Sequence, residues 1–170
     1  ITGGASGIGL AAATRFAAMG LKVCIADLGD DRVAQAVAAA AAAAPGGAAD
    51  IFGLVIDVSK IEDVQRLEAQ VRGRFGGTDI LINNAGIQPG SSMFGPAENW
   101  SRVLGVNLWG VIHGVQAFVP GMIARGRPGL VINTGSKQGI TTPPGDPAYN
   151  VSKAGVKVLT EALEHELRNT

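Results

Sequence analysis

Short apolar runs alternate with helix-forming segments along the chain, and this alternation limits the possible folds more than any other feature. Four runs have the length and apolar character of strands, at residues 22–27, 51–59, 79–86 and 130–134. Between them, apolar residues recur at helical spacing. Continuously apolar strands that alternate with helices are typical of a parallel sheet covered on both faces. We therefore expect an α/β fold of three layers with a doubly wound parallel sheet.

The composition describes one globular domain, residues 1–170, and narrows its partners. Apolar residues make up 46% of the 170 residues and charged residues 16%. Fourteen basic residues balance fourteen acidic ones, so no net charge points to nucleic acid or an anionic membrane. No continuous apolar run reaches the roughly 18 residues of a membrane helix, and no signal peptide is visible. We therefore expect a cytoplasmic protein that acts on a small molecule.

The segment Thr2–Gly9, TGGASGIG, is rich in glycine and leads directly into a helical segment. Gly3, Gly7 and Gly9 have the spacing G-x-x-x-G-x-G, which differs from the common dinucleotide fingerprint G-x-G-x-x-G. A glycine turn at a helix start presents backbone N–H groups and the positive end of the helix dipole to a phosphate. The segment therefore predicts a phosphate site, although an ordinary turn with a helix cap would have a similar sequence.

Two acidic residues end strand-like runs. Asp27 lies eighteen residues after Gly9, where a doubly wound fold places an acid against the adenosine ribose of a dinucleotide. A 2′-phosphate there would meet like charge, which costs ~4 kcal/mol at 4 Å and a dielectric near 20. Neither Leu28 nor Ser6 supplies a compensating cation, so we expect NAD rather than NADP. The pair Asp57–Val58 ends the next run, where it could bracket an adenine ring.

The chain's only tyrosine, Tyr149, precedes Lys153 by four residues in a segment with helical character. Residues i and i+4 share one face of a helix. An ammonium beside a phenol favours the phenolate and lowers the tyrosine pKa from its ordinary value near ~10. Such a tyrosine can exchange a proton with an alcohol or a carbonyl. Ser136 follows the run 130–134, and its hydroxyl could hydrogen-bond the same substrate oxygen.

Taken in order, these motifs resemble those of the short-chain dehydrogenase/reductase family over essentially the whole chain. The ordered set is TGGASGIG, Asp27, Asp57–Val58, the motif NNAG at 83–86, Asn107, Ser136 and Tyr149–Lys153. Each motif alone is unspecific, whereas the ordered set is highly specific. The resemblance implies a Rossmann-type fold and NAD(P)-dependent hydride transfer between the nicotinamide and a secondary alcohol or ketone.

The resemblance also implies a role for each matching residue. Tyr149 would be the general acid/base, Lys153 would hold the nicotinamide ribose, and Ser136 would orient the substrate oxygen. Asn107 would kink its helix and hold a water that relays protons. The implied cofactor-binding residues are Gly3, Ser6, Gly7, Ile8, Gly9, Asp27, Leu28, Asp57, Val58, Asn84, Ala85, Gly86, Tyr149 and Lys153.

The chain also departs from the family's pattern. Only Ile1 remains of the strand that precedes the glycine segment, and the family's C-terminal third has no counterpart. We therefore expect a fold that is incomplete at both ends, and a fragment of a longer protein. The resemblance implies a homodimer or homotetramer for that full-length protein.

Three other functions compete with this one. A serine hydrolase would pair Ser136 with His165, but the local sequence GSKQG lacks the G-x-S-x-G elbow. Two distant histidines and one cysteine give no metal-ligand cluster, so we expect no metal. A dinucleotide-binding protein without turnover, or an inactive fragment, remains the main alternative. Substituting Tyr149 by Phe distinguishes it from an enzyme.

Overall fold

The computed structural model describes residues 1–170 and contains parallel strands alternating with helices, so the predicted α/β fold is confirmed. The strands are β1 (Val23–Asp27), β2 (Ile51–Val55), β3 (Ile80–Asn83) and β4 (Leu130–Asn133). The helices are α1 (Gly7–Ala18), α2 (Asp30–Ala43), α3 (Ile61–Phe75), α4 (Ala97–Leu104), α5 (Gly110–Ala124), α6 (Gln138–Thr141) and α7 (Pro147–Leu167). A 3₁₀ turn, η1 (Gly47–Ala49), precedes β2, and a π-helical segment, η2 (Gly105–Trp109), joins α4 to α5.

The strands form two parallel pairs, β1 with β2 and β3 with β4. The first two residues lie between the pairs and connect them. The N–H of Ala26 in β1 donates to the carbonyl of Ile1 at 3.0 Å, and the N–H of Thr2 donates to that of Ile82 in β3, also at 3.0 Å. From this point an apolar groove of about 360 Å³ continues between the strand pairs. The two strand pairs are therefore connected only through Ile1 and Thr2, which lie between β1 and β3.

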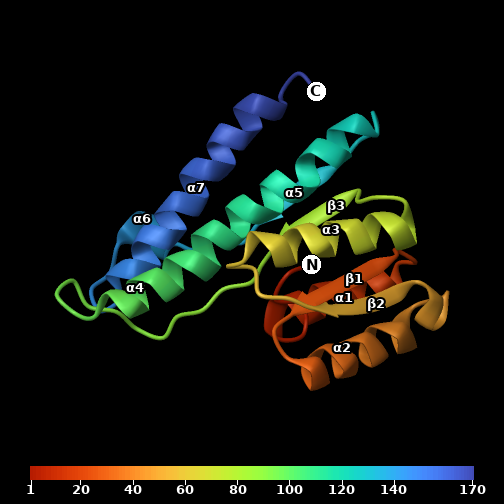
Figure 1. Ribbon diagram of the computed structural model, residues 1–170, viewed down its shortest axis with the longest axis horizontal. Coiled ribbons are helices and arrows are strands. Elements are labelled where there is room, and N and C mark those ends of the chain that lie inside the picture. Colours follow the sequence, from red (N-terminus) through yellow and green to blue (C-terminus); the bar gives the residue numbers. More distant parts are fainter.

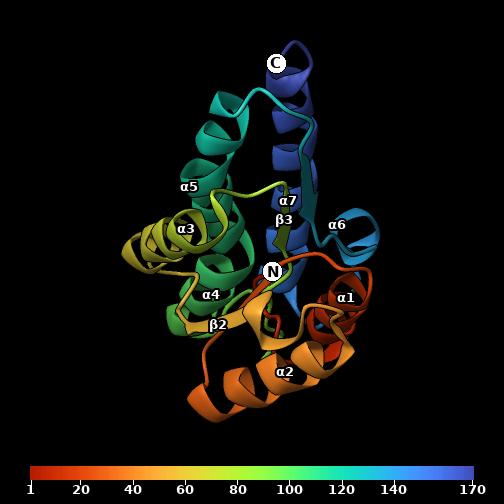
Figure 2. The same ribbon diagram turned by 90° about the vertical axis from the view of Figure 1, so that its right-hand side faces the viewer.

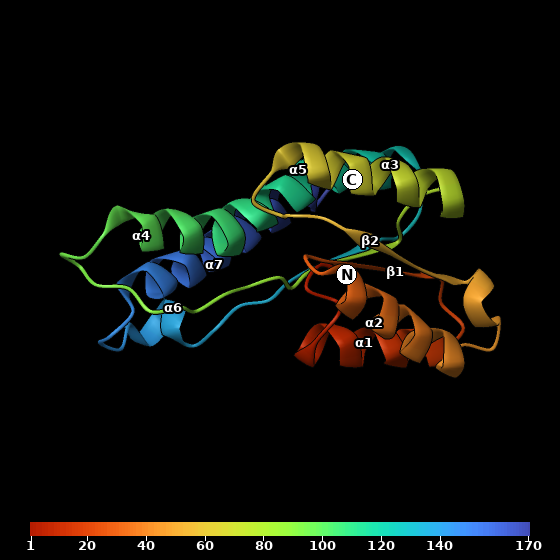
Figure 3. The same cartoon turned by 60° about the horizontal axis from the view of Figure 1, so that its bottom comes forward.

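Helices cover both faces of the strands. Figure 3 shows α1 and α2 on one side of β1 and β2, with α3 and α5 on the other. On the first side, buried alanines of α1 and α2 pack against Val23, Ile25 and Ile51, so the alanine-rich sequence of α2 permits close packing. On the second side, Leu81 packs with Phe118 of α5 and with the apolar face of α3. These two cores form the three expected layers.

Two expected strands end earlier than the apolar runs do. The run 51–59 forms a strand only to Val55, because Asp57 turns the chain by accepting a hydrogen bond from the N–H of Ser59 at 3.0 Å. The run 79–86 forms a strand only to Asn83, because the N–H groups of the next two residues donate hydrogen bonds to the side chain of Thr2. Both turns place polar residues at the carboxyl ends of the strands, where an open parallel sheet binds its ligands.

One helix is long and apolar enough to cross a membrane, although it contains no continuous run of 18 apolar residues. It comprises α4, η2 and α5, Ala97–Ala124, with a mean hydropathy of 1.3. In the structure this helix contacts both α3 and α7. Figures 1 and 2 show it alongside α7 over much of its length. Its apolar composition thus serves packing within the fold.

Candidate active site

A groove of about 410 Å³ lies at the carboxyl ends of β1, β2 and β3. Its lining includes all the residues predicted to bind the cofactor, with the exception of Gly9. These residues come from the glycine segment, from the ends of three strands and from α7. The groove therefore brings Tyr149 and Lys153 together with Asp27, although they are more than 120 residues apart in the sequence.

The glycine segment is shaped for close approach from outside. Gly7 has φ +50°, which an L side chain rarely adopts, and a Cβ there would meet no atom within 4 Å. Ser6 precedes α1 without capping it, so no side chain satisfies the first N–H groups of this helix. Gly9 has a different role, because a Cβ there would overlap the carbonyl oxygen of Gly3. The N-terminus of α1 therefore offers unsatisfied donors beside an open backbone.

Asp27 connects the end of β1 to the glycine segment. Its carboxylate accepts hydrogen bonds from the N–H of Ala5 at 3.0 Å and from the N–H of Leu28 at 2.8 Å. A guanidinium nitrogen of Arg32 lies 3.8 Å from Asp27 Oδ1, and Arg32 lines the same groove. The sequence analysis missed this cation, because it considered only the residues adjacent to the acid and in the glycine segment. The signal was present, since Arg32 is in the first turn of the helix that follows β1.

Thr2 and Asn84 hold the glycine segment against the end of β3. Thr2 Oγ1 accepts hydrogen bonds from the N–H of Asn84 at 3.0 Å and from the N–H of Ala85 at 3.1 Å. Asn84 Nδ2 donates to the carbonyls of Thr2 and Gly3, and its Oδ1 accepts from the hydroxyl of Thr134 after β4. This network fixes three segments of the groove wall relative to one another.

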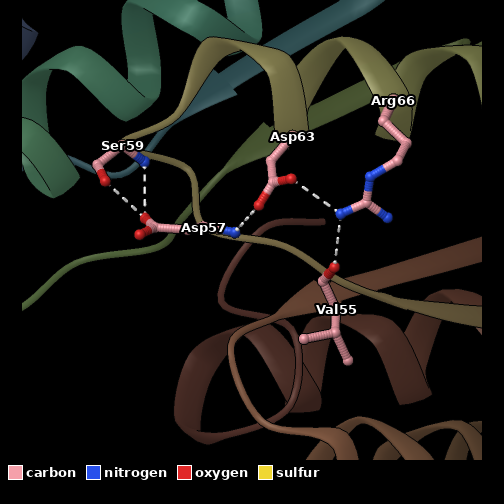
Figure 4. A network of polar contacts seen from close by, with 5 residues as sticks. All are labelled: Val55, Asp57, Ser59, Asp63 and Arg66. Atoms are coloured by element: carbon pink, nitrogen blue, oxygen red, sulfur yellow. Dashed lines mark hydrogen bonds and ion pairs between the residues drawn. The ribbon is translucent and has the colours of Figure 1, made fainter.

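The turn containing Asp57 is held by hydrogen bonds from both sides (Figure 4). The hydroxyl of Ser59 donates to Asp57 Oδ1 at 2.7 Å, and the N–H of Asp57 donates to Asp63 Oδ2 at 2.8 Å. Arg66 donates to the other oxygen of Asp63 at 2.9 Å and to the carbonyl of Val55 at 3.1 Å. These two donors to its carboxylate lower the pKa of Asp63. The network uses one oxygen of Asp57 and leaves the other free to accept a bond in the groove.

Helix α7 carries both Tyr149 and Lys153. Asp146 caps its start by accepting a hydrogen bond from the N–H of Tyr149 at 3.4 Å, and Pro147 occupies the first helical position. Lys153 is 5% exposed, and its Nζ donates to the carbonyl of Thr134 at 2.7 Å. Burial lowers the pKa of Lys153 from its ordinary value. Its ammonium lies 5.7 Å from the centre of the Tyr149 ring, so the expected pairing on one helix face is present.

Asn107 lies behind the groove, in the π-helical segment η2, and is fully buried. Its side chain accepts from the N–H of Ile87 at 2.8 Å and donates to the carbonyl of Ile87 at 2.9 Å. It also donates to the hydroxyl of Ser152 at 3.3 Å. The side chain thus links the segment after β3 to α7. Local π-helical turns of this kind frequently occur at functional sites.

Ser136 and the histidines lie outside the groove. Ser136 Oγ accepts a hydrogen bond from the N–H of Gln138 at 3.2 Å and does not line the groove that contains Tyr149. His165 is exposed and lies 3.6 Å from Glu164, whereas His113 Nδ1 lies 2.9 Å from the carbonyl of Val58. No hydrogen bond joins Ser136 to either histidine, so the geometry of a serine hydrolase is absent.

The comparisons with known proteins agree with the ordered motifs. The family model described as short chain dehydrogenase matches residues 1–170. The chain belongs to the short-chain dehydrogenase family. It is 39% identical over 167 residues to a protein of Eggerthella lenta named 3beta-hydroxysteroid dehydrogenase 1, and these residues are 98% of this chain and 63% of the relative.

Further members resemble the chain in sequence and structure. A Mycobacterium tuberculosis protein named "Probable oxidoreductase EphD" is 38% identical over 98% of this chain, which spans only 28% of that relative. The crystal structure of a short chain dehydrogenase/reductase from Burkholderia phymatum in complex with NAD is 38% identical, with a TM-score of 0.93. That match covers 99% of this chain and 59% of the Burkholderia chain. The chain therefore spans between about a quarter and two thirds of these relatives.

Proposed function

We propose that this chain is the cofactor-binding and proton-transferring part of an NAD-dependent oxidoreductase that interconverts a secondary alcohol and a ketone. The observation that carries the proposal is the shared groove. Tyr149 and the buried Lys153 line the same cavity as the open glycine turn and Asp27. A phosphate site, a ribose acceptor and a proton donor are thus within reach of one dinucleotide and one substrate. The names of the relatives and the NAD complex of the Burkholderia structure support this reading.

The residues present fit a dinucleotide. The pyrophosphate would bind at the uncapped N-terminus of α1, where Gly7 leaves the backbone open. The carboxylate of Asp27 would accept hydrogen bonds from the adenosine ribose hydroxyls, and the free oxygen of Asp57 would accept one from the adenine amino group. When bound, the nicotinamide supplies the hydride chemistry, and the protein supplies position and proton transfer.

Tyr149 would exchange the proton of the substrate oxygen. A positioned acid/base contributes about 10²–10⁴-fold to a rate, provided that its pKa lies near the working pH. The ammonium of Lys153, 5.7 Å from the centre of the Tyr149 ring, would attract negative charge on the substrate oxygen and on Tyr149 during proton transfer. Lys153 is held by the carbonyl of Thr134, so its position does not depend on the ligand. We propose that Ser136 orients the substrate oxygen, and that Asn107 holds the segment at Ile87 in place.

A dinucleotide-binding protein without turnover is the second candidate, and the observation that favours it is the local hydrogen bond that Ser136 Oγ accepts from the N–H of Gln138. We also propose that the full-length protein forms homodimers or homotetramers. Trp109 on the long helix and Val151 and Val158 on α7 are about half exposed or more, which suits an interface along these helices.

The test compares the chain, within its parent protein, with the variant Tyr149→Phe. NADH binding is followed by nicotinamide fluorescence, and turnover is followed on a panel of secondary alcohols. We expect the variant to bind NADH as the wild type does and to lose about 10²–10⁴-fold in turnover, because only the phenolic oxygen is removed. Equal turnover by both proteins would contradict the role of Tyr149. NADH binding without any turnover by the wild type would support the second candidate.

A further inference from the structure

Hydrogen bonds within the chain occupy almost every polar atom of Asp57. Its N–H donates to Asp63 Oδ2 at 2.8 Å, and its carbonyl accepts from the N–H of Lys60 at 3.0 Å. Its Oδ1 accepts from both the N–H and the hydroxyl of Ser59, at 3.0 and 2.7 Å. The second carboxylate oxygen, Oδ2, has no partner in the structure, and Asp57 lines the groove. One oxygen with a defined position is therefore the polar atom that this residue offers to a ligand.

Helix α3 holds Asp57 from outside the groove. Arg66 donates to Asp63 Oδ1 at 2.9 Å and to the carbonyl of Val55 at 3.1 Å (Figure 4). The carboxylate that accepts the N–H of Asp57 is thus itself fixed to the end of β2. Asp63 pairs with Arg66, whereas Asp57 forms no ion pair, so no neighbouring cation neutralises its charge.

Helix α5 holds the next residue of the turn, Val58. His113 Nδ1 lies 2.9 Å from the carbonyl of Val58. A Cβ on Gly110 would lie 2.8 Å from Val58 Cγ2, so the helix packs directly against this side chain. The turn is therefore fixed by two helices, and it reaches its binding conformation before a ligand arrives.

A fixed acceptor at this point distinguishes two classes of purine. Adenine carries an exocyclic amino group, which donates hydrogen bonds, whereas a 6-oxopurine such as hypoxanthine carries a carbonyl oxygen there, which only accepts. An ionised carboxylate also only accepts. Adenine therefore gains a charge-assisted hydrogen bond, and the 6-oxopurine meets a repelling oxygen. A mobile carboxylate would turn away from that oxygen, whereas a fixed one stays in place.

We propose that Asp63 and Ser59 are positioning residues that make the groove selective for an adenine dinucleotide over its 6-oxopurine analogue. The inference rests on the proposed function, because it concerns the adenine end of the same groove. Neither residue lines the groove, so neither needs to touch the cofactor. Both act through Asp57, by holding its free oxygen where the amino group of adenine arrives.

The selectivity is measured with two cofactors that differ only at this position of the purine. NADH and reduced nicotinamide hypoxanthine dinucleotide are titrated separately against the chain within its parent protein, with nicotinamide fluorescence as the readout. We expect the wild type to bind NADH about tenfold more tightly, the scale of one charge-assisted hydrogen bond. Asp57→Asn should lose this preference, because its amide oxygen would accept from Ser59 and its NH₂ group would face the groove.

The decisive variant is Asp63→Ala, which leaves Asp57 unchanged but removes the acceptor for its N–H. We expect the preference to fall below about threefold, because the carboxylate is then no longer ordered before binding. Asp63→Asn keeps an acceptor and should retain the preference. The matched control is Glu62→Ala, which removes an exposed acid from the same turn of α3 and should leave the ratio of the two affinities unchanged.

A second pair of variants tests the hydroxyl of Ser59. Ser59→Ala should lower the preference in the same direction as Asp63→Ala, whereas Ser101→Ala, at an exposed position of α4, should not. The ratio of the two affinities is the informative quantity, because a general loss of structure weakens both dinucleotides alike. Circular dichroism shows which variants are folded, and Ser59→Ala decides the question if Asp63→Ala is not.

Each outcome decides the inference. A wild-type ratio in the folded alanine variants at positions 59 and 63 would overturn it, because Asp57 would then need no positioning. An equal loss of selectivity in Glu62→Ala would also overturn it, because charge rather than position would be the cause. Equal binding of both dinucleotides by the wild type would overturn it too, while NADH binding leaves the proposed function standing. If the folded wild type binds neither dinucleotide, the proposed function fails and this inference fails with it.

Discussion

The two sides of the groove differ in how firmly their backbone is held. On the side of the glycine segment, half-buried hydrogen bonds of Thr2, Asp27 and Asn84 join this segment to the ends of β1 and β3. Around the start of α7, by contrast, Phe94 is 98% exposed, Ile140 is 71% exposed, and Thr142 has a strained φ of 42°. The firm side is the one proposed for the dinucleotide, and the loose side the one proposed for the substrate.

This difference shows which part of a binding site a chain can build from local segments. The dinucleotide side needs only turns that follow consecutive strands, and their side chains bond one another directly. On the loose side, Ser91 bonds the start of α7, but the large apolar side chains of Phe94 and Ile140 contact solvent. Pre-organisation reduces the cost of ordering on binding, so the dinucleotide side should bind its ligand with little rearrangement.

The largest expected effect comes from breaking the link between the two sides at Asn107. Asn107→Leu leaves the half-buried N–H and carbonyl of Ile87 without their partners, and each such loss costs about 1–3 kcal/mol. We expect the free energy of unfolding, measured by urea denaturation, to fall by about 3 kcal/mol. Asn169→Leu is the control, because Asn169 is exposed near the end of the chain, and it should change stability by less than about 0.5 kcal/mol. Similar losses in both variants would contradict the role of Asn107 as a link.

A pair of glycines sharpens the comparison on the dinucleotide side. Gly7 and Gly90 both have positive φ, at +50° and +87°, and a Cβ on either would meet no atom within 4 Å. Alanine at either position should therefore cost a similar backbone strain of about 1–2 kcal/mol. Only Gly7 lines the groove, so Gly7→Ala should weaken NADH binding at least about tenfold, as its methyl group would meet the pyrophosphate. Equal NADH affinities in the two variants would place the phosphate elsewhere.

Features that depend on neighbouring residues in the sequence were predicted correctly, whereas contacts between distant segments were not. The pairing of Tyr149 with Lys153 follows from helical periodicity, which the sequence displays directly. The resemblance implied an irregular helix at Asn107, and the structure has a π-helical segment there, whereas the bonds of Asn107 to Ile87 and Ser152, 20 and 45 residues away, have no local signal. Arg32 was missed because its approach to Asp27 depends on the direction in which α2 leaves β1.

The same limit applies to the loose side of the groove. The sequence predicts that Ser136 bonds the same substrate oxygen as Tyr149, which stays a prediction, and the structure adds a local bond from the N–H of Gln138 at the start of α6. The short helix α6 was not expected, because four residues give no periodic pattern. Segments without a regular element and with few buried contacts are therefore the ones that sequence reasoning placed least well.

The smallest expected effect is a pH dependence of stability from Lys153. Burial lowers the pKa of Lys153 below its unfolded value of 10.5, so the unfolded chain binds more protons between these two values. Stability should therefore rise with pH in that window, by no more than about 1.4 kcal/mol per pH unit for one proton. Lys153→Met should remove this rise, whereas Lys157→Met, on the exposed side of α7, should keep it.

The thiol of Cys24 titrates in the same pH range, and its contribution to the pH dependence of stability must be subtracted. Burial raises the pKa of the Cys24 thiol to about 11, so Cys24 lowers stability as the pH rises above its unfolded value of 9.0. This contribution is common to the wild type and to both lysine variants, and it cancels in their difference. A wild-type profile that parallels that of Lys153→Met would show that Lys153 titrates normally in the folded chain.

The most direct test of the central claim is a titration of the 170-residue chain with NADH, followed by nicotinamide fluorescence, after circular dichroism has shown that the chain is folded. We predict saturable binding that is at least tenfold tighter than that of NADPH and is weakened by Gly7→Ala. Such a result would show that the dinucleotide side is complete within these residues. A folded chain that does not bind NADH would contradict the account, because the hydrogen-bonded turns at the strand ends would then not form a dinucleotide site.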